Sequence, residues 1–162
     1  MTGEIKSRLI EDIDETTRLI EEYSIATSEI LTTDIDETLE EILQRIGDIN
    51  EAIGIQRADI DEACGECTEQ ESDLIHKMIT GGHIPLGISQ EMREIHKAAV
   101  KMRSAFLAVR DKEKQAALRV DARVKELRIE LENVNSDRKK MSGYSAMSGG
   151  IGGSGGSFDG RL

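Results

Sequence analysis

Apolar side chains recur at alternating steps of three and four positions as far as residue 134, which is the spacing of one helical face. This spacing predicts three helices, over residues 4–31, 35–79 and 90–141. The second segment keeps an unbroken heptad register, which is typical of a coiled coil. Its face consists of Ile35, Leu39, Ile42, Ile46, Ile49, Ile53, Gln56, Ile60, Ala63, Cys67, Gln70, Leu74 and Lys77.

Turn and capping residues separate these segments. Asp34 stands three residues before a glutamate, so we expect an N-cap with a capping box and a short antiparallel turn at residues 32–34. A continuous helix through these residues is the alternative, because neither Gly nor Pro forces a turn there. Gly81 and Pro85 end the second helix, and Ser89 is expected to cap the third.

The third helix is expected to lose its register once. Two consecutive four-residue steps lead from Val109 to Ala117 and indicate a local unwinding of the coiled coil. Residues 143–162 are rich in Gly and Ser and are expected to form a flexible tail, which leaves one helical domain over residues 1–142. The face of the helix is Met92, Ile95, Ala99, Met102, Phe106, Val109, Ala117, Val120, Val124, Leu127, Leu131 and Val134.

These elements predict an all-α fold, an elongated antiparallel three-helix coiled-coil bundle. At 1.5 Å per residue the helices would be about 40 Å, about 66 Å and about 80 Å long, so the first covers only part of the other two. We therefore expect an exposed two-helix seam near the loop at residues 81–89, with Leu74, Met78, Ile95 and Phe106 along it. A partner helix, from another copy or another protein, would cover that seam. The alternative is a seam that tolerates exposure.

The charge is unevenly distributed along the chain. Residues 1–75 contain 22 acidic against five basic side chains, a net of −17, whereas residues 76–162 carry a net of +6. Halves of opposite sign favour a chain that folds back on itself, although each exposed pair contributes less than ~1 kcal/mol. The total of −11 argues against nucleic acid as the main partner, because phosphate binding needs a basic face.

Two further features bear on the compartment. No apolar run approaches the ~18 residues of a membrane span, so we expect no stable membrane insertion. The N-terminal residues lack an apolar signal core, and the two cysteines are then expected to be reduced thiols. Both features favour a cytoplasmic protein.

The candidates for chemistry are a Cys-x-x-Cys pair and three histidines. Cys64 and Cys67 lie inside the heptad run, so two small apolar thiols in or beside the seam are the favoured interpretation, with a zinc or redox pair as the alternative. His76, His83 and His96 have no nucleophile at a recognisable spacing. The glycine-rich tail follows a helix rather than a strand, which argues against a phosphate-binding loop. We therefore expect no enzymatic activity, no metal and no cofactor.

Two stretches resemble flagellar export chaperones of the FlgN and FliT type. "ILTTDIDETLEEILQRIGDINEAI" is similar to that family's early helices, in which a short turn precedes leucine-rich acidic repeats, and Asp34, Leu39 and Ile42 occupy the matching positions. "VKELRIELENVNSDRKKMSGY" resembles its last helix, which runs into a tyrosine and a loose C-terminus. The resemblance covers about residues 5–145.

The resemblance implies a cytoplasmic escort that binds a helical terminus of a flagellar hook-filament junction protein and presents it to the export apparatus. The cargo helix would bury its apolar stripe on the exposed seam. Tyr144 matches the family tyrosine that engages the export gate, and Phe158, without a family counterpart, is a second docking candidate. The expected cargo-binding residues are Phe106, Val124, Leu127, Leu131 and Val134.

The alternative function is that of a self-associating structural coiled-coil protein. Its partner would be another copy of itself, in a stable dimer or tetramer with the heptad seam of residues 35–79 at the centre. A metal or thiol protein is the third possibility.

Overall fold

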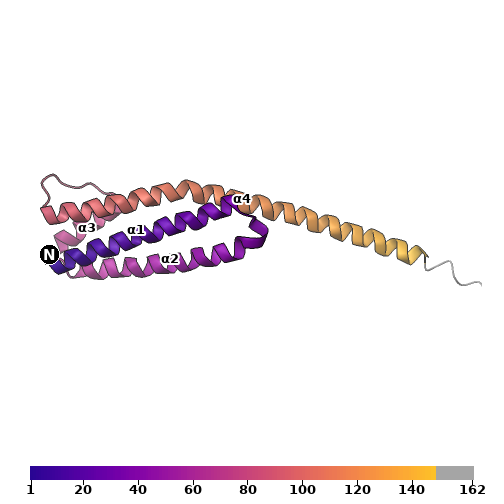
Figure 1. Cartoon of the computed structure of the whole chain (residues 1–162), viewed down its shortest axis with the longest axis horizontal. Helices are drawn as coiled ribbons and strands as arrows, with labels where there is room; N and C mark the ends of the chain where they lie inside the picture. Colours follow the sequence, from indigo (N-terminus) through magenta and orange to yellow (C-terminus); the bar gives the residue numbers. More distant parts are fainter. Residues whose placement is uncertain (149–162) are drawn as a thin grey trace, which may run out of the picture. The chain divides into compact units, whose positions relative to one another are not determined.

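The computed structural model describes the backbone of residues 1–148 and the side chains of residues 1–141. Within that range the chain forms four helices and no strand, so the predicted all-α class is confirmed. The helices are α1 (Gly3–Thr32), α2 (Ile35–Gly65), α3 (Glu69–Thr80) and α4 (Gln90–Ser148), coloured along the sequence in Figure 1.

The chain divides into two compact units, Met1–Val120 and Asp121–Leu162, and the division falls within α4. We call the first unit the bundle, and residues 121–141 of the second unit the terminal segment. The predicted single domain over residues 1–142 therefore corresponds to the bundle and part of the second unit.

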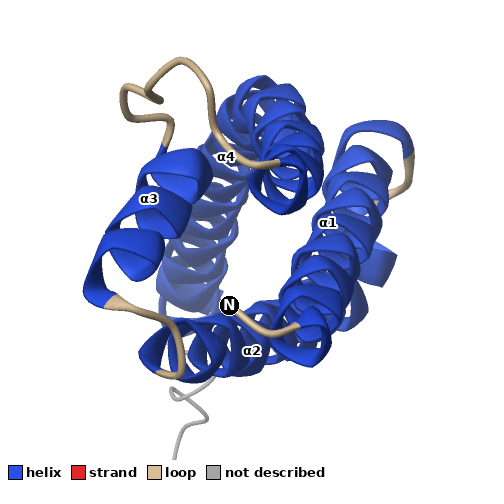
Figure 2. Cartoon of the chain, turned by 90° about the vertical axis from the view of Figure 1, so that its left-hand side faces the viewer, coloured by secondary structure: helices blue, strands red, loops and turns tan. Residues whose placement is uncertain are grey.

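In the bundle, α1 and the first part of α4 run parallel, and α2 runs antiparallel to both (Figures 1 and 2). Lys6 pairs with Glu94 at 2.7 Å near the start of both parallel helices, and Tyr23 bonds to Glu113 at 2.6 Å further along. The pairs between α1 and α2 run in the opposite sense and are Arg8–Glu66 and Glu29–Arg45.

The chain turns between α1 and α2, so the alternative of one continuous helix is excluded. Asp34 is the N-cap of α2, and its carboxylate accepts a hydrogen bond from the backbone N–H of Asp36 at 3.1 Å. Arg119 of α4 donates to the carbonyl of Ile30 at 2.8 Å and to that of Thr33 at 2.9 Å. These bonds satisfy acceptors that have no partner within the last turn of α1, so α4 holds this corner in place.

The segment predicted as one helix over residues 35–79 is in fact two helices. α2 ends at Gly65, and α3 begins after Thr68. Thr68 and Glu71 form a capping box, in which the Thr68 hydroxyl accepts from the Glu71 N–H at 3.4 Å and the Glu71 carboxylate accepts from the Thr68 N–H at 3.1 Å. Because the heptad spacing continues through this corner, the apolar pattern alone did not reveal it.

α3 lies beside α2 and α4 and closes the seam that was predicted to be exposed (Figure 2). Met78 and Ile95 are completely buried, and Leu74 is half-buried. Phe106 alone among the four seam residues stays exposed, at 53%. The prediction of an uncovered seam was therefore wrong for Met78 and Ile95, because it assumed a second helix without a break.

The loop at residues 81–89 returns the chain to the end of the bundle at which α3 starts, so α3 and α4 run parallel (Figure 1). Gly81 takes the left-handed conformation, with φ of +83°, that ends α3. Ser89 caps α4 as predicted, since its hydroxyl accepts from the Met92 N–H at 3.3 Å.

Two hydrophobic clusters fill the bundle. The larger lies between all four helices, whereas the smaller lies between α1, α2 and α4, because α3 has only 12 residues. The larger cluster contains Leu9, Ile13, Ile20, Ile60, Ala63, Cys64, Ile75, Met78, Met92, Ile95, Ala98, Ala99, Met102 and Val109. The smaller contains Ala26, Ile30, Ile35, Ile42 and Ala116. The bundle thus changes from four helices to three beyond the end of α3.

α4 keeps its register where a slip was predicted. Ala116 is buried and Ala117 is exposed, so the steps along the face remain four, three and four. The residues at these steps are Val109, Glu113, Ala116 and Val120. The predicted slip was placed too early because the pattern put the second of two adjacent alanines in the seam; two consecutive four-residue steps instead lead from Ala116 through Val120 to Val124.

The end of α4 also differs from the prediction. The helix continues to Ser148 and passes the boundary predicted between residues 142 and 143. Residues 149–162, predicted to form a flexible tail, lie outside the described residues.

Candidate functional site

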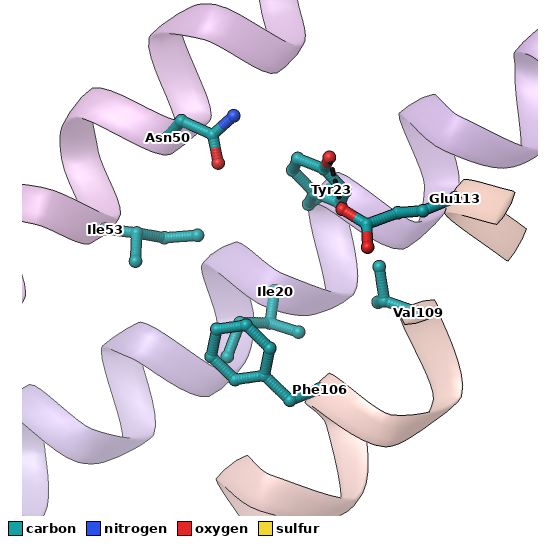
Figure 3. A pocket seen from close by; sticks show the side chains of 7 residues that line it. All are labelled: Ile20, Tyr23, Asn50, Ile53, Phe106, Val109 and Glu113. Carbon is teal, nitrogen blue, oxygen red and sulfur yellow. Dashed lines mark hydrogen bonds between the residues drawn. The ribbon is translucent and has the colours of Figure 1, made fainter. Parts of the chain in front are cut away.

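The exposed side chain of Phe106 stands between two cavities on the bundle. A cavity of about 260 Å³ lies at the C-terminal end of α3, where Ile79 and Thr80 meet residues of α2 and α4. A smaller cavity of about 80 Å³ lies next to it (Figure 3). Phe106 and Ile53 line both cavities, so they form the wall that the two share. This apolar opening is what remains of the predicted seam.

Charged groups lie at the wall of the larger cavity. Arg57 and Asp61 come from exposed positions of α2, and His76 comes from an exposed position of α3. The other lining residues are apolar apart from Thr16, which is buried, and Thr80. Such a lining could hold an apolar side chain whose neighbours are polar.

A hydrogen-bonded polar pair lines part of the smaller cavity. Tyr23 of α1 donates its hydroxyl to the Glu113 carboxylate of α4 at 2.6 Å, and Figure 3 shows the two side chains directed toward each other. Burial, followed by this hydrogen bond, raises the pKa of Tyr23 to about 12. Glu113 thus places a carboxylate at a seam position of α4, where an apolar side chain would be usual. The Tyr23 hydroxyl supplies a hydrogen-bond donor to this carboxylate.

The terminal segment presents a second apolar surface. Four of its apolar side chains follow each other at steps of three and four, and they are 41% to 62% exposed. They are Val124, Leu127, Leu131 and Val134, which we call the terminal stripe. This spacing is that of the seam of a coiled coil, whose side chains are normally covered by a second helix.

Charged residues surround the terminal stripe without giving it a strong charge. The terminal segment carries six basic and five acidic side chains, so an apolar partner surface is favoured over a highly charged one. Arg123 pairs with Glu126 at 3.1 Å and with Glu130 at 3.3 Å along the same helix. Ile129 is 59% exposed, but it lies outside the stripe.

The predicted site residues fall into separate parts of the chain. Phe106 belongs to the bundle, whereas the other four predicted cargo-binding residues form the terminal stripe. Tyr144 lies within α4, but its side chain is not among those described, and Phe158 lies outside the described residues. Sequence reasoning missed the cavity walls at Ile53 and His76. The signal that could have found them is the Thr-Glu-Gln-Glu capping sequence at residues 68–71, which starts α3 as a separate short helix.

The cysteines lie at the corner between α2 and α3. Cys64 is buried in the larger cluster, and burial raises the pKa of its thiol to about 11. Cys67 is half-buried, and burial raises the pKa of its thiol as well. Both are free thiols that pack in or against the core.

Among the described residues, no group of three or more His, Cys, Asp or Glu side chains is placed to hold a metal ion. No helix in the described part of the chain combines the length and the apolar character that crossing a bilayer requires.

The chain was compared with models of known protein families, with curated proteins and with solved structures. None of the three comparisons finds a match.

Proposed function

We propose that this chain is a binding protein that holds an amphipathic helix of another protein along the terminal stripe. The observation that carries the proposal is the exposure of four consecutive seam positions on one face of the terminal segment, at 41% to 62%. A partner helix with a complementary apolar face would cover them in the helix-in-groove mode.

The energetics suit a complex that forms and releases. Full burial of a Val or Leu side chain stabilises by about 1.5–3 kcal/mol, and these four are already partly covered. The stripe would therefore contribute on the order of 4 kcal/mol before the cost of association is subtracted. That magnitude favours a transient escort over a permanent complex.

The specific form that we propose is a cytoplasmic export chaperone. The resemblance of residues 30–53 and 124–144 to flagellar export chaperones supports a cargo of hook-filament junction proteins, delivered to the export apparatus. In this proposal the terminal stripe holds a helical terminus of the cargo. Tyr144 and Phe158 remain the proposed docking residues for the export apparatus.

Phe106 extends the same proposal to the bundle. Its ring is 53% exposed and separates two apolar cavities, so a bulky side chain of the cargo could insert beside it. The other predicted seam residues are buried (Met78 and Ile95) or half-buried (Leu74) within the bundle and have no part in this proposal.

Isothermal titration of the full chain with the terminal helices of junction proteins tests the proposal. Leu127→Asp or Leu131→Asp should reduce binding at least tenfold, because a carboxylate would be buried in an apolar contact. Ile129→Asp is the matched control, since it places the same charge on an exposed apolar position outside the stripe. Equal binding by all three variants would exclude the stripe as the binding surface.

Self-association through α2, the predicted alternative, receives less support. The heptad residues Ile42, Ile49 and Ile60 are buried inside the bundle, so they are not accessible for a second copy. A structural role would have to use another surface.

A further inference from the structure

We infer that the bundle has a docking groove of its own, which binds an acidic amphipathic helix of a partner protein in line with α3. The groove lies between residues 43–57 of α2 and residues 103–117 of α4, and we call it the α2–α4 groove. The inference rests on the proposed function, because that proposal assigns Phe106 to cargo, and it adds the chemistry of the segment that Phe106 would meet.

The groove begins where α3 ends. The 12 residues of α3 pack against α2 and α4 as the fourth helix of the bundle and stop at Thr80 (Figure 2). The two cavities beside Phe106 open at this point, and Ile53 of α2 and Phe106 of α4 line both (Figure 3). A partner helix placed there would extend an interface that α3 already makes within the chain.

Burial falls on both walls of the groove beyond the end of α3. On α2, Ile60, Ile53 and Ile46 share one face at steps of seven. Ile60 is 5% exposed, whereas Ile53 and Ile46 are only half-buried. On α4, Ala99 is completely buried, and Phe106, seven residues later, is 53% exposed. The same seam positions are thus covered beside α3 and partly open beyond it.

The α2–α4 groove is long enough for about four helical turns. At 1.5 Å per residue, residues 103–117 of α4 extend about 21 Å. Leu43 and Leu107 add apolar surface at the edges of the groove, at 49% and 67% exposed. The apolar side chains that a partner helix would cover are Leu43, Ile46, Ile53, Phe106 and Leu107.

Basic side chains flank the α2–α4 groove. Arg57 lines the larger cavity from α2, and Arg103 lies beside Gly81 at the end of α3. Arg110 and Lys114 follow Arg103 along the same side of α4, at steps of seven and four. Among the described residues, none of these four basic side chains has an ion pair, and Nη1 of Arg103 is buried without a hydrogen-bond partner.

The acidic residues nearby do not cancel this charge. The Glu113 carboxylate lines the smaller cavity but accepts from the Tyr23 hydroxyl at 2.6 Å. Asp61 lies beside α3, at the end of the groove. The helical period places the other acidic side chains of the two walls on faces away from the groove. They are Asp48, Glu51 and Asp111.

Two further basic residues of the walls, Arg45 and Lys112, already bond to α1 and are not counted. The α2–α4 groove is therefore basic in a chain whose net charge is −11. Complementary charge steers a partner to its site and excludes wrong partners. This contrast selects a helix with an apolar stripe and acidic flanks.

Fluorescence anisotropy of the full chain with two synthetic helices tests the inference. Each probe has about three heptads, with leucine at the seam positions, and the flanking positions are all glutamate in one probe and all lysine in the other. We expect the glutamate probe to bind at least tenfold more tightly than the lysine probe. The net charge of the whole chain predicts the reverse order.

Substitutions locate the bound glutamate probe. Arg110→Glu/Lys114→Glu should weaken its binding at least tenfold, because two attractive contacts become repulsive. Phe106→Ala should weaken it to a similar extent, since an aromatic anchor is lost. Lys125→Glu/Arg128→Glu is the matched control, with the same charge change at two exposed positions of the terminal segment, and should leave binding unchanged.

Three results would overturn the inference. They are a lysine probe that binds as tightly as the glutamate probe, a loss of binding in the control variant alone, and a dimer of the chain that dissociates in Phe106→Ala. The last result would place a second copy in the groove. If the glutamate probe fails while junction-protein helices bind through Leu127, the proposed function stands without the groove. If the probe binds through Arg110 and Phe106 while no junction-protein helix binds, the groove stands and the proposed function falls.

Discussion

The Tyr23 hydroxyl of α1 donates to the Glu113 carboxylate of α4 at 2.6 Å, at a level of the bundle that α3 does not reach. Glu113 stands where the seam of α4 would otherwise be apolar. The pair therefore links two helices at this level through a hydrogen bond between residues that are 90 positions apart in sequence. It joins α1 and α4 in the part of the bundle where only three helices pack.

Removing this hydrogen bond should destabilise the bundle. Tyr23→Phe leaves the Glu113 carboxylate without its tyrosine donor, and we expect the free energy of unfolding to fall by about 1 kcal/mol. Urea denaturation at pH 7 measures the change. Glu113→Gln is the matched control, because an amide oxygen can still accept from Tyr23.

Because of the same pair, we expect the Tyr23 phenol to ionise at an unusually high pH. The folded-state pKa of Tyr23 is about 12, raised from 10.0, because burial and the bond to Glu113 favour the neutral phenol. Its contribution to stability is therefore complete below pH 10 and is lost as the pH rises through 12. The phenolate absorbance of a Tyr144→Phe variant, which leaves Tyr23 as the single tyrosine, should rise near pH 12. A rise near pH 10 in the folded protein would contradict this prediction.

The stability that Glu71 contributes at the start of α3 should be lost in acid. Its carboxylate accepts from the Met1 ammonium at 2.8 Å and from the Thr68 N–H and hydroxyl, and these bonds lower its pKa to about 2. A lowered pKa stabilises the fold above the unfolded value of 4.5, and that stability is lost as the pH falls toward 2.

Two substitutions separate the contributions of Glu71. Glu71→Ala removes the capping box and the ion pair and should cost about 1 kcal/mol at pH 7. Glu71→Gln keeps a side chain able to complete the box and should cost less. Unfolding curves at pH 7 and pH 3 measure both. If the two variants were equally stable at pH 7, the capping box would have no role in α3.

Met78 and Phe106, which were both predicted to lie in the exposed seam, should differ in how much stability their substitution by alanine costs. Met78 is a completely buried residue of α3, so Met78→Ala should cost about 2–5 kcal/mol. Phe106 is 53% exposed, so Phe106→Ala should cost clearly less. Thermal unfolding compares them. A mild effect at Met78 would indicate that α3 does not cover the seam.

The two thiols should react in a fixed order. Cys64 is 1% exposed and has a pKa of about 11, whereas Cys67 is half-buried. Because the thiolate is the reacting species, Cys67 should react first with a thiol reagent at pH 8, and Cys64 should react only after unfolding. Mass spectrometry of the labelled chain identifies the order, and early labelling of Cys64 would contradict its burial.

Much of the fold could be predicted from apolar spacing and capping residues. The helical class, the caps at Asp34 and Ser89 and the end of α3 at Gly81 all follow from local rules. The break at residues 66–68 did not, because the heptad positions on both sides of it remain in phase. One continuous helix over residues 35–79 would leave Met78 exposed, whereas a break before α3 buries it. That burial depends on tertiary packing, which the apolar spacing does not show.

For the candidate site, the sequence predicted the terminal stripe but not the cavities beside Phe106. The terminal stripe follows from periodicity, and the described residues place no second helix on it, so its exposure agrees with its pattern. The cavities beside Phe106 were not predictable, because they depend on where α3 ends relative to α2 and α4. Two adjacent alanines also concealed the true register of α4, since Ala116 and Ala117 differ only in the direction they face.

Hydrogen exchange along residues 121–141, with and without a junction-protein terminal helix, tests the central claim most directly. An uncovered helix opens locally and exchanges fast, whereas a covered one is protected. We predict that cargo slows exchange around Val124, Leu127 and Leu131 by at least tenfold and leaves the buried core around Ile95 unchanged. Exchange in residues 121–141 that is the same with and without cargo would contradict the proposal that the terminal stripe is the binding surface.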